Sequence, residues 1–193
     1  MNRNFNIRQQ RLFGAVPDTR FYFSHSSIQS AFDTIVRAMK RAEGPVAVLG
    51  GAGFGKSLLV ELVSESLCER MDVVKLQSAR ICSRQALLQN ILYELQLPYR
   101  GLSEGELRLS ILDRLEPSPE TAPDGILIVV DEAQTLHPKL LDELRLLTNF
   151  SRNSQLRVRL LLVGNMRLEE LLANPQLVSL NQRLAARCYL QPM

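Results

Sequence analysis

A glycine-rich turn between a short apolar run and a helical pattern constrains this chain more than any other feature. Residues 46–57 read VAVLGGAGFGKS, so the spacing G-x-x-x-x-G-K-[ST] begins at Gly50 and ends at Ser57. Glycines let the chain fold back with its backbone N–H groups pointing inward, and inward N–H groups bind phosphate. The alternative, a glycine-rich turn with an incidental lysine, is disfavoured by the apolar strand before it and the helix after it. The sequence therefore predicts a nucleotide site.

The side chains of this loop have separate predicted roles. Lys56 supplies a positive charge for the β- and γ-phosphates, and the Ser57 hydroxyl binds Mg²⁺. The helix that follows directs the positive end of its dipole at the same phosphates. We expect ATP to contact the whole loop and the first apolar residue of the helix, which are Gly50, Gly51, Ala52, Gly53, Phe54, Gly55, Lys56, Ser57 and Leu58.

A second apolar run, Ile126–Val130, is followed at once by two carboxylates. The run shows no alternation, so both faces of this strand must be buried, as in the centre of a parallel sheet. Burying carboxylates is costly unless a metal ion or a partner compensates them. We therefore expect Asp131 to bind Mg²⁺ or its water, and Glu132 to polarise the attacking water. The open alternative is an acidic helix N-terminus that the helix dipole stabilises.

A third strand candidate, residues 158–163, is apolar except for Arg159 and ends in Gly164 and Asn165. A polar amide at the tip of a strand beside the acidic strand can form hydrogen bonds with both the γ-phosphate and the attacking water. The alternative is that Asn165 is an ordinary turn-forming residue. The sequence thus predicts polar side chains from three strands around one phosphate group.

Strands and helices alternate along the chain, which indicates an α/β fold. We expect a P-loop NTPase three-layer αβα sandwich with a doubly wound parallel sheet and the ligand at the carboxyl ends of the strands. Residues 1–20 form an N-terminal arm and residues 21–193 the core domain, with residues 116–125 as a surface loop. The expected strands are 46–49, 72–76, 126–130, 158–163 and 187–192, and the expected helices are 28–41, 58–70, 83–95, 103–115, 138–150, 168–173 and 175–183.

Composition limits the classes of protein to which this chain can belong. Its 193 residues, 46% hydrophobic and 22% charged, are typical of one globular domain. The formal net charge of +3 is too small to indicate nucleic-acid binding by itself. No apolar run approaches the ~18–20 residues that span a bilayer, and residues 1–10 are too polar for a signal peptide. We therefore expect a cytoplasmic protein without membrane insertion, whose three isolated cysteines are reduced and mostly buried.

The motifs and their order resemble those of AAA+ ATPases. Among these, the chain looks most like the general secretion pathway protein A (ExeA-type) group, which is close to the transposition ATPases of the TniB and Mu B kind. The resemblance extends over residues 13–193. Besides GGAGFGKS, it rests on Phe13-Gly14 followed by PDTRFY, on VVDEAQTLHPKLLDELRLLTNF, on LLLVGNMRLEELL and on NPQLVSLNQRLAARCYLQPM. The DEAQ segment with its ELRLLTN continuation is the most specific of these.

The resemblance implies the same roles for the loop and the strand ends as the residues themselves do. It makes Asp131 the metal ligand of the acidic strand and Glu132 the catalytic base. Asn165 takes the place of the residue that senses the γ-phosphate, where the closest group usually carries glutamine. Arg183 matches the arginine that one AAA+ subunit offers to a neighbour's γ-phosphate, and Arg187 is the second candidate. The alternative for both arginines is an ordinary surface position.

The resemblance also implies an Mg²⁺-dependent ATPase that works as a homo-oligomer, either a ring or a filament. Its ATP cycle would drive assembly or remodelling of a partner complex, of the type II secretion or pilus kind. Two alternatives stay open: a DNA-binding ATPase adaptor of the transposition type, and a nucleotide-gated scaffold with little hydrolysis. AAA+ modules normally continue into a small helical lid, and this sequence stops at Met193 without one. We therefore expect weak nucleotide binding and slow turnover.

Overall fold

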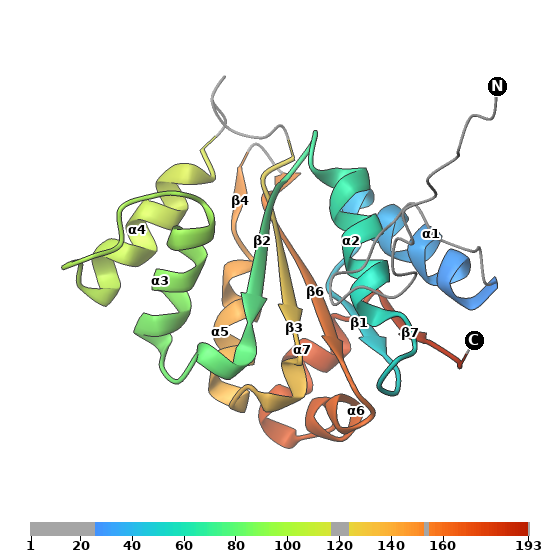
Figure 1. Cartoon of the computed structure of the whole chain (residues 1–193). Coiled ribbons are helices and arrows are strands. Elements are labelled where there is room, and N and C mark those ends of the chain that lie inside the picture. The colour runs from blue at the N-terminus through green and yellow to red at the C-terminus, as the bar shows by residue number, and fades with distance from the viewer. Residues whose placement is uncertain (1–25, 117–123, 153–154, 193) are drawn as a thin grey trace, which may run out of the picture.

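A parallel sheet runs through the centre of the computed structural model, which describes residues 26–116, 124–152 and 155–192 (Figure 1). Its strands lie in the order β2-β3-β6-β1-β7, and each neighbouring pair is parallel. All carboxyl ends therefore meet at one edge. The bounds are β1 Val46–Leu49, β2 Asp72–Gln77, β3 Ile126–Asp131, β6 Val158–Gly164 and β7 Ala186–Tyr189.

Helices cover both faces of this sheet, as Figure 1 shows. Successive residues of β6 face opposite sides: Leu160 belongs to the apolar cluster that contains residues of α3 to α7, whereas Leu161 belongs to the cluster that contains residues of α1 and α2. This alternation confirms the three-layer αβα sandwich. The helices are α1 Ser26–Arg41, α2 Lys56–Leu67, α3 Arg84–Glu94, α4 Glu104–Arg114, α5 Pro138–Leu147, α6 Arg167–Leu172 and α7 Val178–Gln182, with 3-10 turns η2 Ser78–Arg80, η3 Ala133–Thr135 and η4 Pro175–Leu177.

Serine caps begin α3 and α4. The Ser83 hydroxyl accepts a hydrogen bond from the backbone N–H of Ala86 at 3.1 Å. Ser103 and Glu106 form a complete capping box, in which the Glu106 carboxylate accepts the backbone N–H of Ser103 at 2.8 Å. The hydrogen bonds from the Ser103 hydroxyl, at 2.7 Å, and from the Ser103 backbone N–H favour the charged carboxylate and hold the pKa of Glu106 below its usual value. The caps set the start of each helix where the sequence predicts it.

The structure differs from the sequence prediction in several segments. The last strand ends at Tyr189, and the expected helix 175–183 divides into η4 and α7, because Asn174 and Pro175 begin a separate 3-10 turn. A short antiparallel pair, β4 Ser151–Arg152 and β5 Gln155–Leu156, was not foreseen. The expectation of mostly buried cysteines is wrong: Cys68 and Cys82 are exposed. Cys188 is buried, and its burial raises the pKa of its thiol. The arm 1–20 and most of the loop 116–125 lie outside the described residues.

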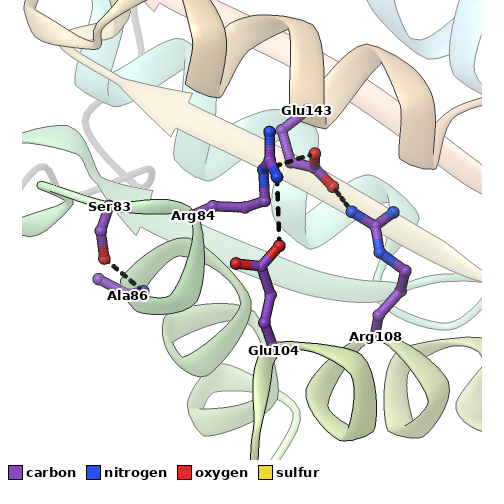
Figure 2. Close-up of polar contacts among 6 residues, drawn as sticks. All are labelled: Ser83, Arg84, Ala86, Glu104, Arg108 and Glu143. Atoms are coloured by element: carbon purple, nitrogen blue, oxygen red, sulfur yellow. Dashed lines mark hydrogen bonds and ion pairs between the residues drawn. The ribbon is translucent and has the colours of Figure 1, made fainter.

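A buried carboxylate ties the three helices α3, α4 and α5 together, as Figure 2 shows. The Glu143 side chain on α5 is only 2% exposed, and one of its oxygens lies 3.1 Å from the Arg84 Nε atom on α3. Its other oxygen accepts a hydrogen bond from Arg108 on α4. Arg84 also reaches Glu104 at 3.3 Å, on the exposed side of the cluster. Two guanidinium groups therefore share one buried carboxylate.

Replacing Glu143 by alanine should lower the free energy of unfolding by about 1–3 kcal/mol, because Arg84 and Arg108, whose side chains are partly exposed, lose the buried carboxylate they share. Urea denaturation followed by circular dichroism measures this loss. The matched control is Glu104→Ala, whose side chain is 44% exposed, and it should cost less than about 1 kcal/mol. Equal losses in the two variants would contradict this account of the cluster.

Candidate nucleotide site

The carboxyl ends of β1, β3 and β6 form the edge at which most of the predicted site residues lie. β6 is the middle strand of the three, and the register pairs Leu49 of β1 with Gly164 of β6. The backbone N–H of Gly50 donates to the Gly164 carbonyl at 3.1 Å, so the loop leaves β1 bonded to the tip of β6. The structure thus brings the loop, Asp131, Glu132 and Asn165 to one edge.

The glycines of the loop are needed at particular positions. Gly53 and Gly55 have φ angles of 80° and 81°, in the left-handed region that residues with a Cβ rarely adopt. A Cβ added to Gly51 would lie 3.0 Å from the Phe54 ring, which packs over the loop and against the core beneath α1 and α2. The Gly55 carbonyl accepts the N–H of Leu59 at 2.9 Å. The loop therefore passes directly into α2.

Lys56 lies inside the curve of the loop. Its Nζ atom donates to the carbonyl oxygens of Gly50 at 3.0 Å and Gly51 at 2.8 Å. The ammonium group is thus held over the concave side of the loop, where a phosphate would lie. Ser57 is exposed in the first turn of α2, and Leu58 beside it is half-buried. A hydroxyl that is free of the core can reach a metal ion bound beside the loop.

The two carboxylates follow β3 in different backbone conformations. Asp131 ends the strand, and its Oδ1 atom accepts the backbone N–H of Glu132 at 2.9 Å. Glu132 has φ 50° and ψ 39°, a left-handed conformation that is unfavourable for a residue with a long side chain. The hydroxyls of Ser78 and Thr135 both lie 2.9 Å from the Glu132 carbonyl oxygen and 2.7 Å from each other. These contacts hold the unfavourable turn in place.

Asn165 follows β6 and faces the same edge. Its side-chain oxygen accepts the backbone N–H of Arg167 at 2.9 Å, and its own backbone N–H donates to Gln134 Oε1 at 3.2 Å. The amide nitrogen of Gln134 donates to the Glu132 carboxylate at 2.5 Å. Gln134 therefore connects the tips of β3 and β6.

Sequence reasoning missed the three residues that hold Glu132, namely Ser78, Gln134 and Thr135. A signal for Ser78 was present, since it is the first residue after β2, and β2 is the neighbour of β3 in the sheet. The strand order was needed to use this signal, because 52 residues separate Ser78 from the end of the apolar run at Val130. Gln134 and Thr135 appear in the sequence analysis only as letters of the DEAQT segment, and nothing in the sequence indicated a role for either of them.

The two arginines lie away from this edge. Arg183 precedes β7 and donates to the Asn149 side chain. Its carbonyl oxygen lies against Gly44, since a Cβ added to Gly44 would be only 2.5 Å from that oxygen. Gly44 is six residues before Gly50, roughly 15–20 Å of extended chain. Arg187 lies within β7 opposite Ala47 and donates to Asn181. The structure does not bring Arg183 to the nucleotide edge of its own chain.

In this fold a phosphate-binding loop joins β1 to α2, and β6 lies between β1 and the acidic strand β3. This arrangement defines a P-loop NTPase. A family match narrows the class further. A profile described as "AAA domain" matches residues 39–172, and the chain therefore belongs to this family of AAA+ ATPases.

Two kinds of relative accompany this match. The chain is 26% identical over 181 residues to the general secretion pathway protein A of Aeromonas hydrophila, a match that covers 94% of this chain and 33% of that protein. The fold is similar to that of the ORC2 protein of Aeropyrum pernix in its ADP form, with a TM-score of 0.69 and 17% identity over 94% of this chain and 50% of that one. The ORC1 protein of the same organism in complex with DNA gives a TM-score of 0.63 at 21% identity, over 89% of this chain and 46% of that one.

The chain spans about a third of the length of the secretion relative and about half of the two structural neighbours. In the described ranges 26–116, 124–152 and 155–192, no helix has the length and apolar content that a membrane crossing requires.

Proposed function

We propose that this chain binds ATP with Mg²⁺ and hydrolyses it to ADP and phosphate. The observation that carries the proposal is the meeting of three groups at one edge of the sheet: the Lys56 loop from β1, the Asp131–Glu132 pair from β3, and Asn165 from β6. A phosphate loop alone serves binding, whereas an added carboxylate and a polar strand tip are what attack by water requires. The whole loop from Gly50 to Leu58 is proposed to contact the nucleotide.

The donor groups fit both proposed ligands. Among the described residues, the Lys56 ammonium is held by two neutral carbonyl oxygens and by no carboxylate, so a phosphate can replace them without breaking an ion pair there. Ser57 and Asp131 offer a hydroxyl and a carboxylate, the hard oxygen ligands that Mg²⁺ prefers, usually together with water and phosphate oxygens. The bound ion would neutralise charge on the phosphates during hydrolysis.

The chain's own residues then have distinct roles in hydrolysis. Glu132 accepts a hydrogen bond from the attacking water and orients it toward the γ-phosphate. Asn165 contacts that phosphate from the tip of β6 through its side-chain nitrogen, since its side-chain oxygen already accepts the Arg167 N–H. Arg183 lies at the opposite edge of the sheet, so any contact it makes with a γ-phosphate must be with that of a neighbouring subunit. Arg187 is the second candidate for this contact.

Two variants separate binding from hydrolysis. Lys56→Ala should abolish nucleotide binding, because the positive charge inside the loop is lost. Glu132→Gln should retain ATP binding and lose about 100-fold or more in turnover, because a neutral amide cannot polarise water as a carboxylate does. Fluorescent-nucleotide titration and phosphate release measure the two properties. Turnover in Glu132→Gln equal to that of the wild type would overturn the role given to Glu132.

The trans role of Arg183 predicts that two inactive variants complement each other. Arg183→Ala and Glu132→Gln should each hydrolyse ATP slowly, and an arginine supplied by a neighbour is worth about 10³–10⁵-fold in related systems. In a mixture, some interfaces combine the intact Glu132 of one variant with the intact Arg183 of the other, so phosphate release should rise above the average of the two. Additive activity in the mixture would argue against a contact across subunits, and a mixture with Arg187→Ala in place of Arg183→Ala tests the second candidate.

For the biological role, we propose a cytoplasmic homo-oligomeric core domain, covering residues 21–193 after an arm of residues 1–20, that assembles or remodels a secretion or envelope complex. The similarity to general secretion pathway protein A supports this choice. A DNA-binding adaptor is the second candidate, supported by the fold likeness to an ORC1 protein in complex with DNA. A nucleotide-gated scaffold with little hydrolysis is the third.

Phosphate release across a protein-concentration series, with and without duplex DNA, distinguishes these roles. The leading proposal predicts that specific activity rises with protein concentration and does not respond to DNA. A DNA-induced rise, with binding that weakens steeply as salt increases, would favour the adaptor. Bound nucleotide, ATP-dependent oligomers and no phosphate release would favour the scaffold.

A further inference from the structure

We infer that Gln134 is a positioning residue, which holds the Glu132 carboxylate and ties it to the backbone of Asn165. The inference rests on the proposed function, because it assigns the residue that orients the proposed base. Gln134 lies in the 3-10 turn after β3 and is half-buried between the tips of β3 and β6. Gln134 is part of the DEAQ segment, but none of the roles proposed above is assigned to it.

Both ends of the Gln134 amide are used. Its Nε2 atom donates to Glu132 Oε2 at 2.5 Å, and its Oε1 atom accepts the N–H of Asn165 at 3.2 Å. Hydrogen bonds to a charged carboxylate are among the stronger ones in proteins. A side-chain amide offers a donor and an acceptor on two separate atoms, whereas an ionised glutamate has no donor and an apolar residue has neither, so these could not make both contacts.

The tip of β6 leaves room for this side chain. A Cβ added to Gly164 would lie 2.4 Å from Gln134 Oε1, so any larger residue at this position would displace the amide. On the other side, the neighbouring Ala133 is fully buried and anchors the turn in the core. Gln134 therefore has a defined position relative to both strands.

The carboxylate and the backbone of Glu132 are held by different residues. The hydroxyls of Ser78 and Thr135 hold the Glu132 carbonyl and the left-handed turn. Neither of them contacts the carboxylate, whose partner is Gln134. A movement of the β6 tip, when Asn165 engages the γ-phosphate, would thus be passed through Gln134 to the carboxylate that orients the water.

The test compares two variants at this position. Gln134→Leu removes both contacts, whereas Gln134→Glu keeps only the acceptor and places a second carboxylate against Glu132. Both should lower kcat by up to about 100-fold, the cost of a misplaced reacting group, while KM and nucleotide affinity stay within about twofold. The matched control is Gln176→Leu, an exposed glutamine at the start of η4, which should leave kcat unchanged.

A double-mutant cycle separates positioning from general damage. In the Glu132→Gln background, Gln134→Leu should add no further loss, because the carboxylate that it positions is already absent. An additive loss, or a kcat in Gln134→Leu equal to that of an active wild type, would overturn the inference and leave the proposed function standing. Absence of phosphate release from the wild type would overturn both.

A readout without turnover completes the test. The side-chain amide protons of Gln134, identified by their loss in Gln134→Leu, should shift in the NMR spectrum of the nucleotide-free protein when Glu132 is replaced by alanine. The same substitution should leave the amide signals of Gln176 in place. If the Gln134 amide signals do not shift in Glu132→Ala, the proposed contact between Gln134 and Glu132 is overturned even if the enzyme is active.

Discussion

The burial of β1, β3 and β6 on both faces is the constraint on which the rest of the structure depends. With helices on either side, these strands carry almost only apolar residues, because an unpaired polar group between the layers would be costly. The exception is Arg159 of β6, whose guanidinium donates to the carbonyl oxygens of Met39 and Leu156. The polar groups of the site therefore begin where the strands end. Since the strands are parallel, their carboxyl ends meet at one edge, and the phosphate loop, Asp131 and Asn165 follow directly from that.

The edge is also organised by hydrogen bonds between neighbouring strands. Glu132 adopts a left-handed conformation that its own side chain disfavours, and polar groups from both adjacent strands surround it. Ser78 after β2 holds its carbonyl, and Gln134 joins its carboxylate to the peptide that follows β6. The candidate base is thus fixed by two neighbours in the sheet and not by its position in the motif alone.

The two ends of the sheet have different chemistry. The carboxyl edge carries the loop and the carboxylates, whereas Arg183 lies beside the start of β1 and pairs with Asn149. The length of β1 separates the two, so Arg183 does not contact the phosphate loop of its own chain. The proposed contact of Arg183 with a γ-phosphate therefore requires a second copy of the chain.

The sequence by itself determined the layers, the order of the elements and the residues at the strand ends, because unbroken apolar runs and a glycine-rich turn follow from local chemistry. The site residues it predicts remain predictions about function, although the structure places most of them together. Only the tertiary structure decided which strands are neighbours, and therefore that Ser78, Gln134 and Glu132 form one network. It also decided that Glu143 is shared by Arg84 and Arg108. Ser78 lies 54 residues from Glu132, and Arg108 lies 35 residues from Glu143, so no local pattern encodes these contacts.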